Sequence, residues 1–226
     1  MIKGGLPIYL ANMGKELNLM TNNLIITISR QYGSGGRDIG LALAQSLDVA
    51  FYDKELIKLA AKKSGINEKL FENADEMPSN SFLYSLSMGS RNLGGGFNYN
   101  DCLTNDKLFL LQSKVIRELA DKEPCVIVGR CADYILREYP RVANIFIHAS
   151  DEYRVRKVMG YENVDEAKAR DIIRKTDKKR TSYYNYYSDV IWGNACSYHL
   201  SIDSSVLSQE DAVAAIRSFL DGFQKK

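Results

Sequence analysis

The segment from Ile25 to Leu47 constrains the fold more than any other part of the chain. Its sequence, IITISRQYGSGGRDIGLALAQSL, reads as a β-branched apolar run, a glycine-rich turn and a helix with apolar residues at helical spacing. A strand that is apolar on both faces is typical of a parallel sheet covered by helices. Gly33, Gly35 and Gly36 allow the backbone to turn and expose N–H groups at the helix start, where phosphate binds readily. The segment therefore predicts either a phosphate-binding loop or a tight turn that only permits close helix packing.

The loop departs from the common phosphate-loop pattern G-x-x-x-x-G-K-[ST] at three positions. Arg30 stands where the pattern has its first glycine, Gly36 where it has lysine, and Arg37 where it has a hydroxyl residue. Without the lysine, the loop needs another cation. We expect Arg37 to supply it, because it follows Gly36 directly and a guanidinium binds phosphate oxygens through two N–H groups. Arg30, at the other end of the loop, is the competing choice.

The rest of the chain alternates strand patterns with helical patterns. The predicted strands are Leu24–Ser29, Val49–Asp53, Pro124–Arg130, Arg141–Ser150 and Tyr198–Ser205. This alternation predicts a doubly wound α/β domain with a five-stranded, mostly parallel sheet flanked by helices. Ligands of such sheets bind at the carboxyl ends of the strands. We therefore expect the site among the residues that end the strands, which are the glycine loop, Asp53, the Gly129–Arg130 pair, the segment after His148, and Asp203.

Composition argues against several classes of protein. The net charge of +2 is lower than that of a general nucleic-acid binder, so any basic function is local. The four cysteines form no C-x-x-C pair and the chain has two histidines, which argues against a zinc site or a disulfide framework and favours reduced thiols in a cytoplasmic protein. The first twenty residues contain no long apolar run, which argues against a signal peptide or a membrane span.

The chain divides into a short leader and one domain. We expect residues 1–23 to be peripheral, because the first strand pattern begins at Leu24, and residues 24–226 to form a single domain. Met77–Asp101 is rich in Ser, Gly and Asn, and a loop of this length is usually a lid, a binding segment or disordered.

The segment from Asp151 to Trp192 is highly charged, then rich in tyrosine, and reads as helical. Arg174, Asp177 and Arg180 share one face of a predicted helix. They form either a solvated face or a set that neutralises phosphate charge. The tyrosines that follow, with Trp192, either stack on a base or pack the helix against a neighbouring helix or a second copy of the chain. We favour the packing role for these tyrosines, which are Tyr183, Tyr184, Tyr186 and Tyr187.

Several of these stretches together resemble the cytidylate kinase-like family, a branch of the P-loop nucleoside monophosphate kinases. They are ITISRQYGSGGRDIG, FYDKELI, CVIVGRCADYIL, the D-x-x-R of Asp177–Arg180 followed by YYNYY, and SIDSS. The resemblance implies a P-loop kinase fold with an acceptor-binding insert at residues 77–101 and a helical lid over residues 151–192. It implies an enzyme that transfers a phosphoryl group from ATP, with Mg²⁺, to a nucleoside monophosphate such as CMP or dCMP. The missing loop lysine keeps two alternatives open, a non-catalytic nucleotide-binding module and a P-loop kinase for another small acceptor.

The resemblance also implies roles for individual residues. The residues that cradle the phosphates of ATP are Gly33, Ser34, Gly35, Gly36, Arg37 and Asp38. Those that bind the acceptor are Asp53, Arg91, Arg130 and Asp177. Those that act on the transferring group are Arg37, Arg174 and Arg180. Asp38 either holds Mg²⁺ or is an ordinary first-turn acid that stabilises the helix dipole.

Overall fold

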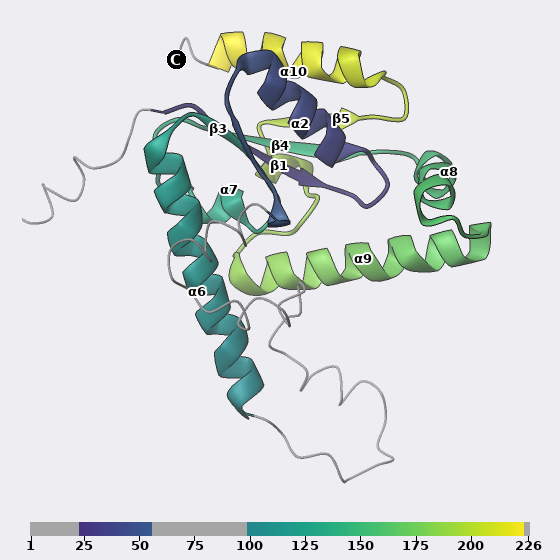
Figure 1. Ribbon diagram of the computed structural model, residues 1–226, viewed down its shortest axis with the longest axis horizontal. Coiled ribbons are helices and arrows are strands. Elements are labelled where there is room, and N and C mark those ends of the chain that lie inside the picture. The colour runs from purple at the N-terminus through teal and green to yellow at the C-terminus, as the bar shows by residue number, and fades with distance from the viewer. Residues whose placement is uncertain (1–22, 56–98, 224–226) are drawn as a thin grey trace, which may run out of the picture.

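The computed structural model describes residues 23–55 and 99–223, and a five-stranded parallel sheet forms their centre (Figure 1). The strands are β1 (Ile25–Arg30), β2 (Ala50–Tyr52), β3 (Cys125–Val128), β4 (Val142–His148) and β5 (Leu200–Asp203). Their order across the sheet is β2-β3-β1-β4-β5, and each neighbouring pair is parallel. The predicted sheet is confirmed, and the glycine loop follows the carboxyl end of β1 as expected.

Strand β1 is apolar on both faces because helices cover both sides of the sheet. Ile25 belongs to a core cluster with residues of α6 (Tyr99–Lys122) and α7 (Ala132–Ile135). Ile26 and Ile28 belong to a second cluster, with residues of α2 (Gly36–Leu47) and α10 (Gln209–Phe223). Burying each of these side chains contributes roughly 1.5–3 kcal/mol. Figure 1 shows α2 and α10 together on one side of the strands, with α6 and α7 on the other.

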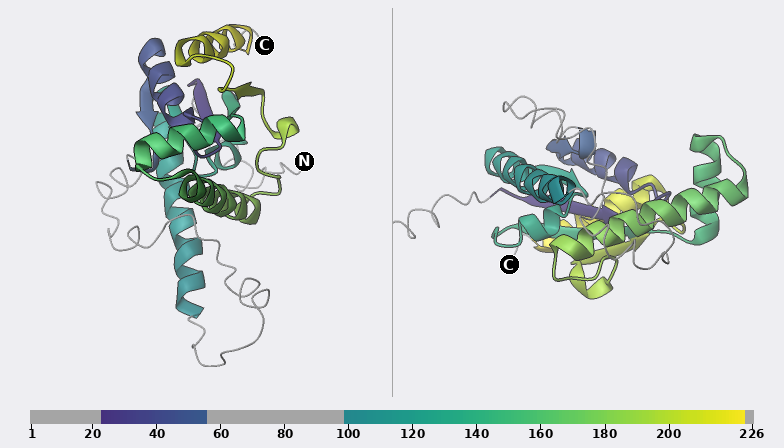
Figure 2. Two further views of the ribbon diagram at one scale, coloured as in Figure 1. Left: turned by 90° about the vertical axis from the view of Figure 1, so that its right-hand side faces the viewer. Right: turned by 90° about the horizontal axis from the view of Figure 1, so that it is seen from below.

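Two helices make up the region predicted as a helical lid. They are α8 (Asp151–Glu162) and α9 (Glu166–Tyr187), joined by a turn in which Asn163 has a left-handed backbone and Asp165 caps α9 through a hydrogen bond from Lys168 N. The last residues of the region, 188–192, lie outside the helix. Figure 2 shows α9 crossing the molecule with α8 at one of its ends, and α6 extending well beyond the sheet.

Other boundaries differ from the prediction for local reasons. Helix α7 ends at Ile135, because the backbone then tightens into turns, with Tyr139 N donating to Leu136 O, ahead of Pro140. Helix α6 begins at Tyr99, so the end of the predicted insert, Met77–Asp101, is helical. The short 3₁₀ helix Ala195–Ser197 was not predicted. Residues 1–22, the rest of the insert and Arg91 lie outside the described residues. None of the described helices is long and apolar enough to cross a membrane.

Candidate functional site

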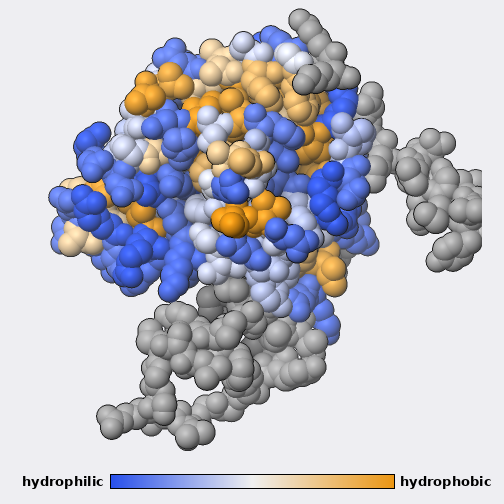
Figure 3. Space-filling view, turned by 180° about the vertical axis from the view of Figure 1, so that it is seen from behind, coloured by the Kyte–Doolittle hydropathy of each residue, from blue (hydrophilic) through white to orange (hydrophobic). Residues whose placement is uncertain are grey.

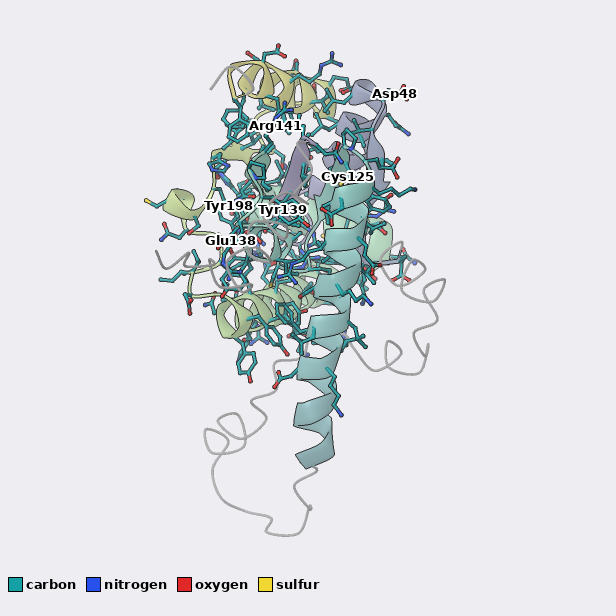
Figure 4. The ribbon with its side chains drawn as sticks, turned by 90° about the vertical axis from the view of Figure 1, so that its left-hand side faces the viewer. Asp48, Cys125, Glu138, Tyr139, Arg141 and Tyr198 are labelled. Carbon is teal, nitrogen blue, oxygen red and sulfur yellow. The ribbon has the colours of Figure 1, made fainter. Side chains whose placement is uncertain are left out.

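The carboxyl ends of β1, β3 and β4 meet at one edge of the sheet, and the glycine loop lies there. Figure 4 labels Asp48, Cys125 and Arg141, which precede or begin β2, β3 and β4 and so mark the opposite, amino edge. In the loop, Gly33 and Gly35 have φ of 81° and 73°, values that favour glycine. A Cβ added at Gly33 would lie 3.0 Å from Arg154 O, whereas one at Gly35 would meet nothing within 4 Å. The loop is therefore closely packed against α8 at Gly33 and open at Gly35.

The start of α2 offers free backbone donors at the open side of the loop. The first hydrogen bond of the helix runs from Ile39 N to Gly35 O, at 3.0 Å. The N–H groups of Gly36, Arg37 and Asp38 precede that bond and have no helical acceptor. Among the described residues, no side chain caps this helix. These donors and the positive end of the helix dipole form a site for an anion such as phosphate.

Hydrogen bonds from distant parts of the chain hold the loop in this shape. Ser204, at the end of β5, donates its hydroxyl proton to Ser34 O at 2.6 Å. Gln31 accepts a hydrogen bond on Oε1 from Ala149 N, just after β4, at 3.1 Å. Tyr32 N donates to Asp177 Oδ1 on α9 at 2.7 Å. Because the loop is fixed from three elements, its donors are preorganised rather than ordered by the ligand.

Arg37 and Asp53 lie together as an ion pair. Arg37 Nε and Nη2 both lie 2.8 Å from Asp53 Oδ2. The Asp53 side chain is 9% exposed and Arg37 58% exposed, so the pair lies at the rim of the site. Asp38, in the first turn of α2, is exposed and lies 3.9 Å from Arg37 Nη1. In this conformation Arg37 faces Asp53 rather than reaching back over the loop, and its role toward phosphate stays a prediction.

Arg130 lies at the end of β3 in an unusual backbone conformation. Gly129, Arg130 and Cys131 have φ of 79°, 60° and 54°, so two non-glycine residues in succession are left-handed. Such conformations persist only where the surrounding structure holds them, and they concentrate at functional sites. The residue is 4% exposed, and its Nη1 has no hydrogen-bond partner among the described residues. A buried cationic donor of this kind fits an anionic ligand.

Asp177 is the centre of a cluster that joins α8 and α9 to the loop. It accepts a hydrogen bond from Arg154 Nη1 at 2.6 Å, in addition to the one from Tyr32 N. Arg154 is buried and also pairs with Asp151. Arg180 Nη1 lies 4.0 Å from Asp177 Oδ1 and donates to Arg30 O at 3.1 Å. Burial raises the pKa of Asp177, against the opposing effects of the Tyr32 N–H group and of Arg154 and Arg180.

The structure divides the residues that the sequence placed on one helix face. Asp177 and Arg180 lie against the loop, whereas Arg174 is 73% exposed and pairs with Asp171 on its own helix at 2.7 Å. Arg154 was not among the predicted site residues, although it is the buried partner of Asp177. The available signal was its position in the first turn after β4, a strand whose carboxyl end belongs to the predicted edge of the site.

The tyrosine cluster packs α9 against α6 and α7, the role that we favoured. Tyr187 stacks on Phe109 with ring centroids 3.9 Å apart and donates to Asp106 at 3.0 Å. Tyr184 donates to Asp133 Oδ2 at 2.8 Å, and both residues are buried. Burial raises the pKa of Asp133. The second half of α9 is thereby fixed to the core.

Comparison with solved structures shows a P-loop kinase fold. An uncharacterized protein from Eubacterium ventriosum is 27% identical, with a TM-score of 0.67 over 88% of this chain and 99% of that one. TT1252 from Thermus thermophilus is 16% identical, with a TM-score of 0.51 over 89% and 98% of the two chains. Shikimate kinase from Bacteroides thetaiotaomicron is 14% identical, with a TM-score of 0.50 over 88% and 98%. These last two likenesses concern the fold alone.

The sequence comparisons agree with the motifs. No curated protein matches this chain. The model of the cytidylate kinase-like family matches residues 25–206, a range that contains the glycine loop, Arg130, both helices of the predicted lid and Ser204. The chain therefore belongs to the cytidylate kinase-like family.

Proposed function

We propose that this protein transfers the γ-phosphoryl group of ATP to the phosphate of a nucleoside monophosphate, CMP or dCMP. The observation that carries the proposal is Arg130, a buried arginine whose Nη1 has no partner among the described residues, at the edge of the sheet that also holds the glycine loop. A buried donor on a charged group is costly unless an anion meets it. The acceptor phosphate supplies that anion.

The donor phosphates bind at the start of α2. The N–H groups of Gly36, Arg37 and Asp38 precede the first helical hydrogen bond, and the space above Gly35 is open. The exposed carboxylate of Asp38 would hold a Mg²⁺ ion, directly or through water. When bound, Mg²⁺ neutralises charge on the transferring group.

The protein's own part in the reaction is to position the two nucleotides and to supply cations. An oxygen of the acceptor phosphate forms a bond to the γ-phosphorus of ATP. The bond between the γ-phosphorus and the oxygen that bridges the β- and γ-phosphates breaks at the same time, and ADP leaves with that oxygen. Little covalent chemistry is needed from side chains, because positioning and charge neutralisation provide most of the catalysis. In this proposal Arg130 orients the acceptor, and Arg180 meets phosphoryl oxygens.

A non-catalytic nucleotide-binding module is the second candidate. The observation that favours it is the ion pair of Arg37 with Asp53, which keeps the expected substitute for the loop lysine away from the loop in this conformation. Such a module would bind ATP without transferring phosphate.

An ADP-release assay separates the candidates. The chain is incubated with ATP and Mg²⁺ against CMP, dCMP, UMP, AMP and GMP, with shikimate and gluconate as acceptors of other chemistry. We expect turnover with CMP or dCMP. Arg130→Met should raise the KM for the acceptor by at least tenfold and leave ATP affinity nearly unchanged. Arg137→Met, which changes an exposed arginine beyond α7, is the control. ATP binding with no acceptor phosphorylated would instead support the module.

A further inference from the structure

Two of the departures from the phosphate-loop pattern lie in contact with each other. A Cβ added at Gly36 would lie 2.6 Å from Arg30 Cβ and 3.2 Å from Arg30 Cγ. The shorter distance is below any that real side-chain carbons adopt, so the stem of Arg30 occupies the space that a side chain at position 36 needs. The arginine at the first-glycine position and the glycine at the lysine position are therefore linked by packing.

The other end of the Arg30 side chain lies on Gly129. A Cβ added at Gly129 would lie 2.3 Å from Arg30 Nη1 and 3.1 Å from Arg30 Cζ. Gly129 directly follows β3 and precedes Arg130. The side chain thus extends from the start of α2, where the donor phosphates bind, to the residue before the acceptor arginine. Its guanidinium lies between the two nucleotide sites of the proposed reaction.

We propose that Arg30 replaces the missing loop lysine, entering the site from the first-glycine position, while Gly36 provides the room for its stem. This inference rests on the proposed function, because it assigns Arg30 to the phosphoryl group in transit. A loop lysine meets the β- and γ-phosphates. A guanidinium meets the same oxygens with two parallel N–H groups.

The backbone of Arg30 is held for this role. Its carbonyl oxygen accepts a hydrogen bond from Arg180 Nη1 at 3.1 Å, and the Arg180 guanidinium lies 5.4 Å from the centre of the Tyr32 ring. Arg180 thereby joins α9 to the residue that ends β1. A hydrogen-bond donor that is already in position stabilises the charge that develops in the transition state without any reorganisation. Such preorganisation is the main source of electrostatic catalysis.

Arg37 is less well placed for the same task. Moving it to the phosphates would separate it from Asp53, whose side chain is only 9% exposed. That movement would give up both contacts of the Arg37 guanidinium with Asp53 Oδ2, each at 2.8 Å. The Arg30 guanidinium, by contrast, already lies against Gly129, the residue before Arg130.

Removal of the charge tests the assignment. Arg30→Met keeps an unbranched stem over Gly36 and removes the guanidinium. We expect it to lower ATP affinity, measured by calorimetry with Mg²⁺, and to slow transfer on the order of 10²-fold or more, as for loss of a preorganised donor to a developing oxyanion. The melting temperature should change little. Arg217→Met is the matched control, because this exposed arginine binds Ser46 O at the far end of α2.

Exchange of the two residues provides the sharper test. Gly36→Lys alone should unfold the loop or abolish ATP binding, because the new side chain overlaps Arg30. Arg30→Gly with Gly36→Lys restores the usual pattern at both positions, and we expect it to transfer phosphate at least tenfold faster than Arg30→Gly alone. No gain in the double variant, with its melting temperature intact, would contradict the exchange.

The outcomes separate this inference from the proposed function. If the wild-type chain binds ATP but phosphorylates no acceptor, the proposed function fails, and the ATP affinities of Arg30→Met and the double variant still decide the role of Arg30. If Arg30→Met retains ATP affinity and turnover while Arg37→Met loses both, the inference is overturned. A wild-type chain that binds no ATP overturns both.

Discussion

The two halves of α9 are packed in different ways. In the first half, residues 166–176, the buried side chains of Ala169 and Ile173 contact a small cluster with Val155 and Val158 of α8. In the second half, residues 177–187, Tyr183 and Tyr184 belong to the large core cluster beneath the sheet. Hydrophilic side chains cover much of the α8–α9 end in the view of Figure 3.

The difference separates a stable part of the site from a part that we expect to open. Helix α8 and the first half of α9 form a unit around a small core, against which Tyr32 of the loop packs while it donates to Glu162 Oε1 at 2.6 Å. Arg154 also joins this unit to the loop, through its close approach to Gly33 and its hydrogen bond to Asp177. A unit with few buried apolar contacts opens at a lower free energy than the global core. Arg174 lies in that unit, whereas Arg180 lies in the fixed half of the helix. We therefore expect the lid to consist of α8 and the first half of α9.

The largest expected effect comes from the fixed half. Tyr183→Ala removes a ring that is 8% exposed and that donates to Gln112 at 3.3 Å. Loss of a buried aromatic side chain costs about 3–5 kcal/mol of unfolding free energy. The whole molecule should lose this stability, measured by urea denaturation with both far-UV and near-UV detection. Tyr186→Ala, at a residue 40% exposed, is the control and should cost far less.

The corresponding change in the opening half should act locally. Ile173→Ala removes a side chain that is 6% exposed within the small α8–α9 cluster, at a cost of about 2–4 kcal/mol. Because that cluster is distinct from the two large clusters on the sheet, hydrogen exchange should show lost protection in α8 and the first half of α9, with β1 and the Tyr183 region unchanged. An equal loss of protection in β1 would show that the two halves open as one unit.

The sequence predicted the core of the molecule better than the part that we expect to open. All five strands were found because each is a short apolar run between helical patterns. Whether such a run is buried depends on the apolar character of its own side chains more than on which residues pack against them. The tyrosines of α9 were assigned to packing for the same reason. These features are local patterns that a single chain displays.

The site was harder to predict because its contacts join distant residues. Arg154 and Asp177 are 23 positions apart, and a run of charges along a helix does not show which carboxylate is buried. Arg37 and Asp53 were both selected, but their pairing depends on how β2 lies beside α2. In the sequence, Arg30 and Gly36 were only two departures from one loop pattern. The structure explains why they occur together, because the stem of Arg30 occupies the space that a side chain at position 36 would need.

A smaller effect is expected at the junction between the two halves. Asp177→Asn keeps an oxygen for the Tyr32 N–H group but removes the charge that faces Arg154 and Arg180. Arg154 retains Asp151, so we expect a cost of about 1–3 kcal/mol, the range for weakening one buried polar contact. Urea denaturation at neutral pH measures it. A cost as large as that of Tyr183→Ala would mean that the junction, rather than the core, holds α9 in place.

The same variant should change the pH dependence of stability. Burial raises the pKa of Asp177, so above the pKa of about 3.9 for an unfolded aspartate the native state binds more protons than the unfolded state. Stability from this group therefore falls as pH rises through that window. Asp177→Asn should remove this part of the slope, and an unchanged slope would show that Asp177 titrates normally in the native state.

The smallest effect on stability is expected at Arg174. Because its substitution should leave the fold intact, any change in turnover would report on function alone. Arg174 and Lys175 both contact Asp171 at 2.7 Å, and their side chains are 73% and 65% exposed. Exposed substitutions of this kind change unfolding free energy by about 0.5 kcal/mol or less, so Arg174→Ala and Lys175→Ala should be equally harmless to the fold.

If α8 and the first half of α9 close over bound ATP, only Arg174→Ala should lower the turnover number, because a guanidinium brought to the phosphoryl oxygens stabilises charge that forms in the transition state. Steady-state kinetics of the two variants, with melting temperatures measured alongside, make the comparison. Equal turnover in both would place Arg174 on a solvated face in every state of the enzyme, and would leave the fixed half of α9 with Arg180 as the part of the helix that acts on phosphate.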